Sequence, residues 1–119
     1  MIGNDAQFAN DLSYLGHALS YCNSQPLALV VFARALQHAN TKIEGSVCKD
    51  IAALLVRAGR FTEAQRYFDR GLKAVRIVKD TKMESSMLLD RGQMFTAMKL
   101  YEQAERDFEL VSPTFSRWR

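Results

Sequence analysis

Residues 48–68 of this chain read CKDIAALLVRAGRFTEAQRYF. Within this stretch Ala52 is followed twelve positions later by Ala64, and Phe68 comes four positions after that. The same spacing of a small residue, an alanine and a phenylalanine occurs twice more, as Gly16, Ala28 and Phe32 and as Gly92, Ala104 and Phe108. The middle alanines are 36 and 40 residues apart, which is the period range of helical-hairpin repeats. The chain is therefore expected to repeat one helical unit three times.

Each unit is predicted to contain two antiparallel helices. On the first helix apolar residues recur at steps of three and four, as in Leu12, Leu15 and Leu19, and so form one helical face. On the second helix the alanine and the phenylalanine lie four apart and share a face. A small residue on each helix lets the two axes approach to about 8–10 Å, and the phenylalanine is expected to fill the gap between the diverging ends. Glycine inside a helix costs roughly 1 kcal/mol against alanine, so Gly16 and Gly92 indicate close packing.

Capping residues predict where the helices begin. Thr41 with Glu44, and Thr81 with Glu84, form two capping-box patterns forty residues apart, in which hydroxyl and carboxylate satisfy free amide groups. Asp5 can cap the first helix. Together with the apolar period, these signals predict helices at about 6–22, 26–39, 43–58, 62–79, 83–98 and 101–111. No stretch alternates with a period of two for long enough to predict a sheet, so the expected fold class is all-α.

The turn inside each unit is predicted at Asn23, Gly59 and Lys99. Glycine readily takes the left-handed conformation that ends a helix, and asparagine is a fair substitute. Lysine is a poor one, so the third turn has the weakest sequence signal.

The repeated residues resemble the tetratricopeptide repeat family, which places Leu-Gly and a Tyr-like residue on the first helix and Ala-x-x-x-Phe on the second. The first-helix matches are Leu12-x-x-Leu15-Gly16-x-x-Leu19, Cys48-x-x-Ile51-Ala52-x-x-Leu55 and Leu88-x-x-Arg91-Gly92-x-x-Phe95. Arg91 departs from the pattern, because the family has an apolar residue there. The resemblance implies one domain over residues 1–119, with repeats at about 9–42, 45–78 and 85–118 stacked as a right-handed superhelix of six helices, and a short aromatic and basic tail at 112–119. The forty-residue spacing of the last two units resembles the family's longer subtype.

In that family the first helices of the repeats line a concave groove that holds a peptide or a segment of another protein. The resemblance implies groove contacts in all three repeats: Asn10, Tyr14, His17 and Tyr21 in the first, Lys49, Asp50 and Arg57 in the second, and Asp90 and Gln93 in the third. Tyr14, Tyr21 and Arg57 are favoured because aromatic and arginine side chains dominate interface hot spots. The core pattern needs none of these side chains, so a purely solvated role stays open for each. The implied function is that of a protein–protein interaction module, either an adaptor or a chaperone-like protein.

Composition is typical of a soluble globular domain. Of the 119 residues 48% are hydrophobic and 24% charged, and the formal net charge is +3, which suits one domain with its own core. No apolar run reaches the roughly eighteen residues that a membrane span needs, and the first residues lack the features of a secretory signal. Two cysteines are too few for a disulfide scaffold, so a reducing, cytoplasmic location is expected.

Residues suited to catalysis or to metal binding are scarce. His17 and His38 are the only histidines, and neither stands at metal-ligand spacing from a cysteine or a carboxylate. Cys22 follows His17 by five residues, which is not a nucleophile–base arrangement that a helix would hold together. We therefore expect no enzymatic activity, no cofactor and no metal ion.

Two alternatives to groove binding remain open. A repeat array normally needs a polar-faced last helix to cover its end, and residues 112–119 are too few to form one. The third repeat and the tail, which contains Phe115 and Trp118, could instead mediate self-association into a homo-oligomer. The second alternative is weak nucleic-acid binding by a stripe of cations on the fourth predicted helix, made of Arg66, Arg70, Lys73 and Arg76. We expect no aromatic stacking platform among these cations, so an ordinary solvated face or an acidic protein partner is favoured over nucleic acid.

Overall fold

The computed structural model describes residues 5–112, which form six α-helices. The helices are α1 Asp5–Tyr21, α2 Gln25–His38, α3 Thr41–Arg57, α4 Phe61–Ile77, α5 Thr81–Ala97 and α6 Tyr101–Val111. No strand occurs within residues 5–112. All six helices predicted from the sequence are present, with ends no more than two residues from the predicted ones, so the all-α prediction is confirmed. The predicted tail lies outside the described residues except for Ser112.

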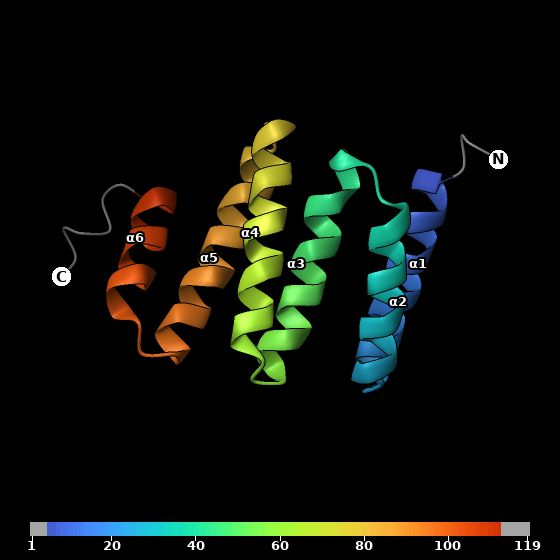
Figure 1. The fold of residues 1–119 in the computed structure, drawn as a ribbon, viewed down its shortest axis with the longest axis horizontal. Helices are drawn as coiled ribbons and strands as arrows, with labels where there is room; N and C mark the ends of the chain where they lie inside the picture. The colour runs from blue at the N-terminus through green and yellow to red at the C-terminus, as the bar shows by residue number, and fades with distance from the viewer. Residues whose placement is uncertain (1–4, 113–119) are drawn as a thin grey trace.

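The helices form a row of three antiparallel hairpins, α1–α2, α3–α4 and α5–α6 (Figure 1). Neighbouring hairpins meet where α2 packs on α3 and α4 packs on α5. The odd-numbered helices also meet one another, α1 with α3 and α3 with α5, whereas within the described range α2 does not contact α4 and α4 does not contact α6. The row is therefore a repeat-like array of hairpins whose odd-numbered helices crowd together on the inner side.

One continuous hydrophobic core runs between the odd-numbered and the even-numbered helices. Its largest fully buried side chains include Phe32 of α2, Ile51 of α3 and Phe68 of α4. Cys48 is also fully buried, as its place in the apolar pattern predicted. Because each hairpin alone leaves one apolar face open, this core explains why the hairpins stack.

Gly16 and Gly92 mark close crossings inside the first and third hairpins. A Cβ atom on Gly16 would lie 2.6 Å from Cε1 of Phe32, and one on Gly92 would lie 2.6 Å from Cε1 of Phe108. Both positions therefore need a missing side chain, as predicted. The two phenylalanine rings lie over the glycines themselves, so each ring occupies the volume that the absent side chain leaves.

The two predicted capping boxes begin one residue too late. The N-cap of α3 is Asn40, whose Oδ1 accepts a hydrogen bond from the backbone N–H of Ile43 at 3.0 Å. The N-cap of α5 is Asp80, whose Oδ1 accepts from the N–H of Met83 at 3.1 Å. Thr41 and Thr81 are consequently the first residues of their helices and not the caps. Asn and Asp are at least as good N-caps as Thr, which is why the chain uses the earlier residue in both places.

The glutamates of these predicted boxes have a different role. Glu44 of α3 accepts a hydrogen bond from Nε of Arg70 at 2.6 Å, and Glu84 of α5 accepts one from Nε of Arg76 at 2.6 Å. Both arginines belong to α4, so α4 is tied to the helix on either side of it. Asp5, predicted as a cap, is the first residue of α1, and the residue before it lies outside the described range.

All three predicted turns adopt the left-handed backbone conformation. The φ angle is 62° at Asn23, 76° at Gly59 and 61° at Lys99. Lys99 therefore ends α5 in a conformation that is unfavourable for a side chain with a Cβ atom, and the third hairpin closes without a glycine.

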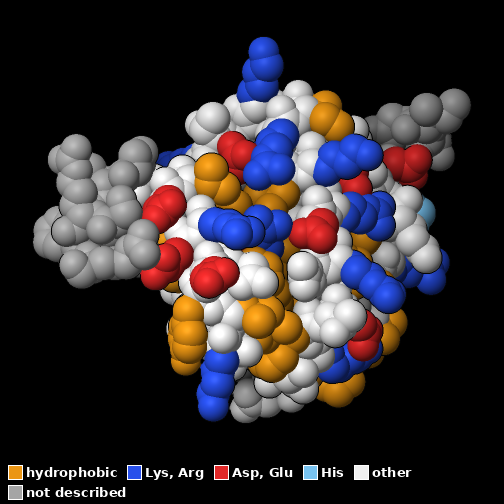
Figure 2. Space-filling view, turned by 60° about the vertical axis from the view of Figure 1, so that its left-hand side comes forward, with side chains coloured by type: hydrophobic (Ala, Val, Ile, Leu, Met, Phe, Trp, Pro, Cys, Tyr) orange, Lys and Arg blue, Asp and Glu red, His pale blue; other side chains and the backbone are white. Residues whose placement is uncertain are grey.

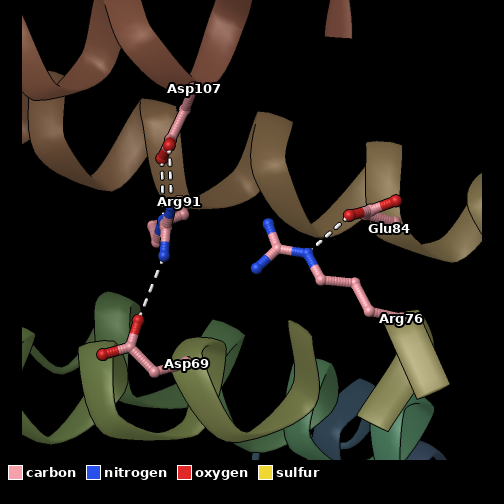
Figure 3. A network of polar contacts seen from close by, with 5 residues as sticks. All are labelled: Asp69, Arg76, Glu84, Arg91 and Asp107. Atoms are coloured by element: carbon pink, nitrogen blue, oxygen red, sulfur yellow. Dashed lines mark hydrogen bonds and ion pairs between the residues drawn. The ribbon is translucent and has the colours of Figure 1, made fainter. Parts of the chain in front are cut away.

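The third hairpin contains an ionic contact at a place where the repeat pattern has apolar residues (Figure 3). Arg91 of α5 donates two hydrogen bonds to Asp107 of α6, at 2.8 Å from Nε and 2.7 Å from Nη2, and a third at 3.0 Å to Asp69 of α4. Asp107 is only 3% exposed. Its hydrogen bonds with Arg91 raise the pKa of that guanidinium group above its usual value. This contact explains why Arg91 occupies the position that Leu15 and Ile51 hold in the other two repeats.

Candidate functional site

Three hollows open along the inner layer of odd-numbered helices. Hollow A lies between α1 and α3, has a volume of about 480 Å³, and is lined by Ala6, Asn10, Ser13, Asn40, Lys42, Ile43 and Ser46. Hollow B lies further along the same two helices, has a volume of about 120 Å³, and is lined by His17, Ser20, Phe32, Asp50, Ala53, Leu54 and Arg57. Hollow C lies between α3 and α5, has a volume of about 240 Å³, and is lined by Ala53, Val56, Arg57, Asp90 and Gln93 above Phe68 and Met94.

Hollows B and C share Ala53 and Arg57 of α3. Both side chains are exposed, so the two hollows adjoin at these two residues of α3. Hollow A lies one to two turns toward the N-terminal ends of α1 and α3, since Asn10 precedes His17 and Ser46 precedes Asp50 on the same helices. We call the three hollows together the groove.

The structure brings most of the predicted contact residues to the groove. Asn10 lines hollow A, His17 and Asp50 line hollow B, Arg57 lines both B and C, and Asp90 and Gln93 line hollow C. Three-residue and four-residue spacing on helices that lie side by side is enough to produce this arrangement.

The three remaining predicted residues are placed differently. Lys49 does not line these hollows, but its Nζ lies 3.4 Å from Oδ2 of Asp90, beside hollow C. Tyr14 and Tyr21 lie outside the three hollows, with 73% and 87% of their surface exposed. The aromatic contacts that sequence reasoning favoured are therefore not part of the groove geometry.

Several lining residues were absent from the sequence prediction. Phe68 and Met94 form the floor of hollow C. The repeat pattern predicted Phe68 as a packing residue, and both side chains are buried in the core. Ser20 and Lys42 could have been found, because each lies one helical turn from a residue that lines the same hollow, His17 in one case and Ser46 in the other.

The two carboxylates of the groove each face the nitrogen of a basic side chain on a neighbouring helix. Oδ2 of Asp50 on α3 lies 3.1 Å from Nε2 of His17 on α1, and Oδ2 of Asp90 on α5 faces Lys49 of α3. Oδ2 of Asp50 is buried and makes no well-aligned hydrogen bond in the described part of the chain. Burial accordingly raises the pKa of Asp50, although His17 and Lys49 act in the opposite direction.

Arg57 differs from these charges. Within residues 5–112 its guanidinium group forms neither an ion pair nor a hydrogen bond, and it stands where hollows B and C join. An arginine presents five N–H donors in a rigid fork that suits carboxylates. This part of the groove can therefore accept an anionic or hydrogen-bond-accepting group from outside.

Two of the four cations in the stripe of α4 are engaged in ion pairs. Arg70 and Arg76 bind Glu44 and Glu84, so only Arg66 and Lys73 of its four members lack an ion pair among the described residues. The expectation that no aromatic residue accompanies the stripe is wrong, because Tyr67 lines a shallow hollow with Arg66 and Arg70.

The end of the molecule that carries α6 shows the same mixing of charge. Turned toward the viewer, this face carries Lys and Arg side chains interspersed with Asp and Glu, and hydrophobic side chains gather below them (Figure 2). A broad single-sign surface, which nucleic-acid binding generally uses, is therefore not visible on this face.

Other chemistry-bearing groups of the described chain were also located. Burial raises the pKa of the Cys48 thiol to about 12, so this thiol stays protonated at neutral pH and is a poor nucleophile. Cys22 is exposed and unpaired by any disulfide. Within residues 5–112 no three His, Cys, Asp or Glu side chains are grouped to hold a metal ion. None of the helices in this range has the length and apolarity that crossing a bilayer requires.

A comparison of the chain with protein-family models, with curated proteins and with solved structures found no match. The resemblance to tetratricopeptide repeats consequently rests on the repeated residues themselves.

Proposed function

We propose that this chain is a tetratricopeptide-like binding module that holds a segment of another polypeptide in its groove and acts without catalysis. The observation that carries the proposal is that hollows B and C adjoin at Ala53 and Arg57 of α3, with polar and charged side chains at the rim and Phe68 and Met94 beneath hollow C. A groove of this kind buries side chains of an extended or helical segment and orients it by a few polar contacts. An adaptor role in a reducing cytoplasm is the setting that we propose for it.

Ala53 gives the sharpest test, because it is exposed and lines both hollows. The substitution Ala53→Trp is expected to fill the groove while leaving the core untouched. Ala33→Trp is the matched control, since Ala33 is exposed on α2 outside the three hollows. On an array of random dodecapeptides, peptides that bind the parent protein should lose binding to Ala53→Trp and keep it to Ala33→Trp. Binding that survives Ala53→Trp, or an array without any binder, contradicts groove recognition.

Self-association is the second candidate function, and the last helix supplies the observation that favours it. Tyr101 and Leu110 of α6 are 58% and 63% exposed, although they belong to an amphipathic helix at the end of the array. A second copy of the chain could cover these side chains. Light scattering over a concentration series tests this candidate, which requires a mass that rises with concentration and falls again in a Tyr101→Ser, Leu110→Ser variant.

A further inference from the structure

Arg57 is distinguished by its unmatched charge. Among the described side chains that line hollows B and C, Asp50 lies against the imidazole of His17 and Asp90 lies against the ammonium group of Lys49, whereas Arg57 forms no ion pair. Its own helix cannot supply a partner, because no carboxylate lies three or four positions away on either side. Glu63, six positions further along the chain, is held by Arg60, with contacts of 2.9 and 2.6 Å.

The two carboxylates of the groove would repel an acidic ligand if they were unmatched. Nε2 of His17 lies 3.1 Å from Asp50, and Nζ of Lys49 lies 3.4 Å from Asp90. The ammonium group of Lys49 offsets the negative charge of Asp90, and the imidazole of His17 lies against Asp50 on the other side of Arg57. An incoming carboxylate where hollows B and C adjoin therefore meets the positive charge of Arg57, which no carboxylate of the described chain pairs with.

An apolar site lies directly beside this charge. The floor of hollow C consists of Phe68 and Met94, both about 1% exposed, and Ala53 and Val56 form its α3 wall. Gln93 at the rim can donate and accept hydrogen bonds. Hollow C thus suits an apolar side chain whose neighbouring backbone meets polar groups.

We propose that the groove ligand is an extended segment with an aspartate or glutamate side chain on Arg57 and an adjacent apolar side chain in hollow C. This inference rests on the proposed function and names the chemistry of its ligand. Hollow B lies on one side of Arg57 and hollow C on the other, so the polypeptide continues past Arg57 in both directions. The carboxylate therefore comes from a side chain and not from a chain terminus.

The test uses four sets of acetylated, amidated dodecapeptides with random flanks and a fixed central pair. The pairs are Glu-Leu, Gln-Leu, Glu-Ser and Lys-Leu, and binding to the parent protein is measured by fluorescence polarisation. The Glu-Leu set should bind about tenfold or more tightly than the Gln-Leu set, because hydrogen bonds between charged groups are the strong ones. It should also exceed the Glu-Ser set by about tenfold, since burying a leucine side chain is worth that much.

Substitutions of Arg57 assign the preference to one side chain. Arg57→Gln should abolish the discrimination between Glu-Leu and Gln-Leu, and Arg57→Glu should shift the preference to Lys-Leu. Arg34→Gln is the matched control, because Arg34 is exposed on α2 outside the three hollows and the substitution removes the same charge. This control should keep the preference of the parent protein.

The outcomes separate this inference from the proposed function. Equal binding of Glu-Leu and Gln-Leu peptides, or a preference that persists in Arg57→Gln, overturns the carboxylate assignment while groove binding stands if Ala53→Trp still blocks it. Binding restricted to peptides with a free C-terminal carboxylate, tested in a parallel set without the terminal amide, also overturns it. Failure of every set to bind removes both the inference and the proposed function.

Discussion

The hairpins α3–α4 and α5–α6 repeat the same residue spacing at an interval of forty, yet different chemistry joins their helices. Ile51 and Tyr67 of the α3–α4 hairpin correspond in the repeat to Arg91 and Asp107 of the α5–α6 hairpin. Ile51 is 1% exposed within the hydrophobic core and Tyr67 packs at its edge, whereas Arg91 and Asp107 form a paired ionic contact. The repeat therefore specifies where two helices meet, and does not specify whether the contact is apolar or ionic.

The small residue at the crossing differs in the same two hairpins. The α3–α4 hairpin has Ala52, which is fully buried, and the α5–α6 hairpin has Gly92, over which the ring of Phe108 lies. One hairpin tolerates a methyl group where the other has none, so the helices and rings of the two hairpins cannot be packed identically.

The largest effect is expected from Asp107→Ala. Removing one partner of a buried ion pair leaves the other charge without compensation, which typically costs about 3 kcal/mol or more. Arg91 keeps only Asp69, whose side chain is 58% exposed, so we expect a loss of about 3 kcal/mol in the unfolding free energy, measured by urea denaturation.

The control for this prediction transfers the contact of the other hairpin. The double variant Arg91→Ile, Asp107→Tyr places the corresponding α3–α4 residues in α5–α6. Its free energy of unfolding is expected to lie within about 1 kcal/mol of that of the parent protein, or above it. Apolar replacements of buried ion pairs commonly behave in this way. A double variant as unstable as Asp107→Ala would show that the two hairpins are not interchangeable at this position.

The second prediction exchanges the small residues at the crossings. In Gly92→Ala the free energy of unfolding is expected to fall by about 1–3 kcal/mol, because the added methyl group overpacks against Phe108. This loss is expected even though alanine is the better helix former by about 1 kcal/mol. Gly16→Ala should lose more, because Phe32 is fully buried whereas Phe108 is half-buried and has more room to move. Thermal unfolding followed by circular dichroism measures both.

Ala52→Gly is the reciprocal exchange and should cost about 1 kcal/mol through the lower helix propensity of glycine. It relieves no contact, because the α3–α4 hairpin already accommodates the methyl group. A Gly92→Ala protein that melts above its parent would contradict the assignment of Gly92 as a packing requirement.

The sequence was sufficient to predict the helices and their pairing, because the spacing of small residues and phenylalanines directly reflects helix geometry. It could not locate the N-caps to the residue, since Asn40 and Thr41 are both acceptable caps and only the backbone path selects between them. The ion pair of Arg91 was also out of reach, because its partner Asp107 lies sixteen residues away on another helix.

The residues predicted as groove contacts include polar side chains that line the hollows, and they omit the floor of hollow C. His17, Asp50 and Arg57 meet in hollow B because α1 and α3 lie side by side. Phe68 and Met94 serve both the core and hollow C, and a sequence pattern cannot separate these two roles. The unmatched charge of Arg57 depends on the geometry of three helices, so only the structure identifies it.

The smallest expected effect concerns Asp50 and Asp90, which occupy equivalent positions forty residues apart. The Asp50 side chain is 17% exposed and that of Asp90 is 34% exposed, and burial raises the pKa of Asp50 above its usual value. The folded protein therefore holds this proton more tightly than the unfolded chain, whose aspartates titrate near about pH 3.9. The contribution of Asp50 to stability is complete below that pH and is lost as the pH rises through the raised pKa.

The Asp50→Asn variant lacks this titrating carboxyl group, so its stability does not contain the pH-dependent contribution of Asp50. The unfolding free energy of this variant, relative to that of the parent protein, is expected to increase as the pH rises from about 4 towards neutrality and then to level off. The effect is small because His17 and Lys49 counteract the cost of burial. Asp90→Asn serves as the control for the loss of one groove charge, since it leaves hollow B intact. Urea titrations at a series of pH values measure the difference, and a difference that is flat or falls with pH would show that burial does not dominate the environment of Asp50.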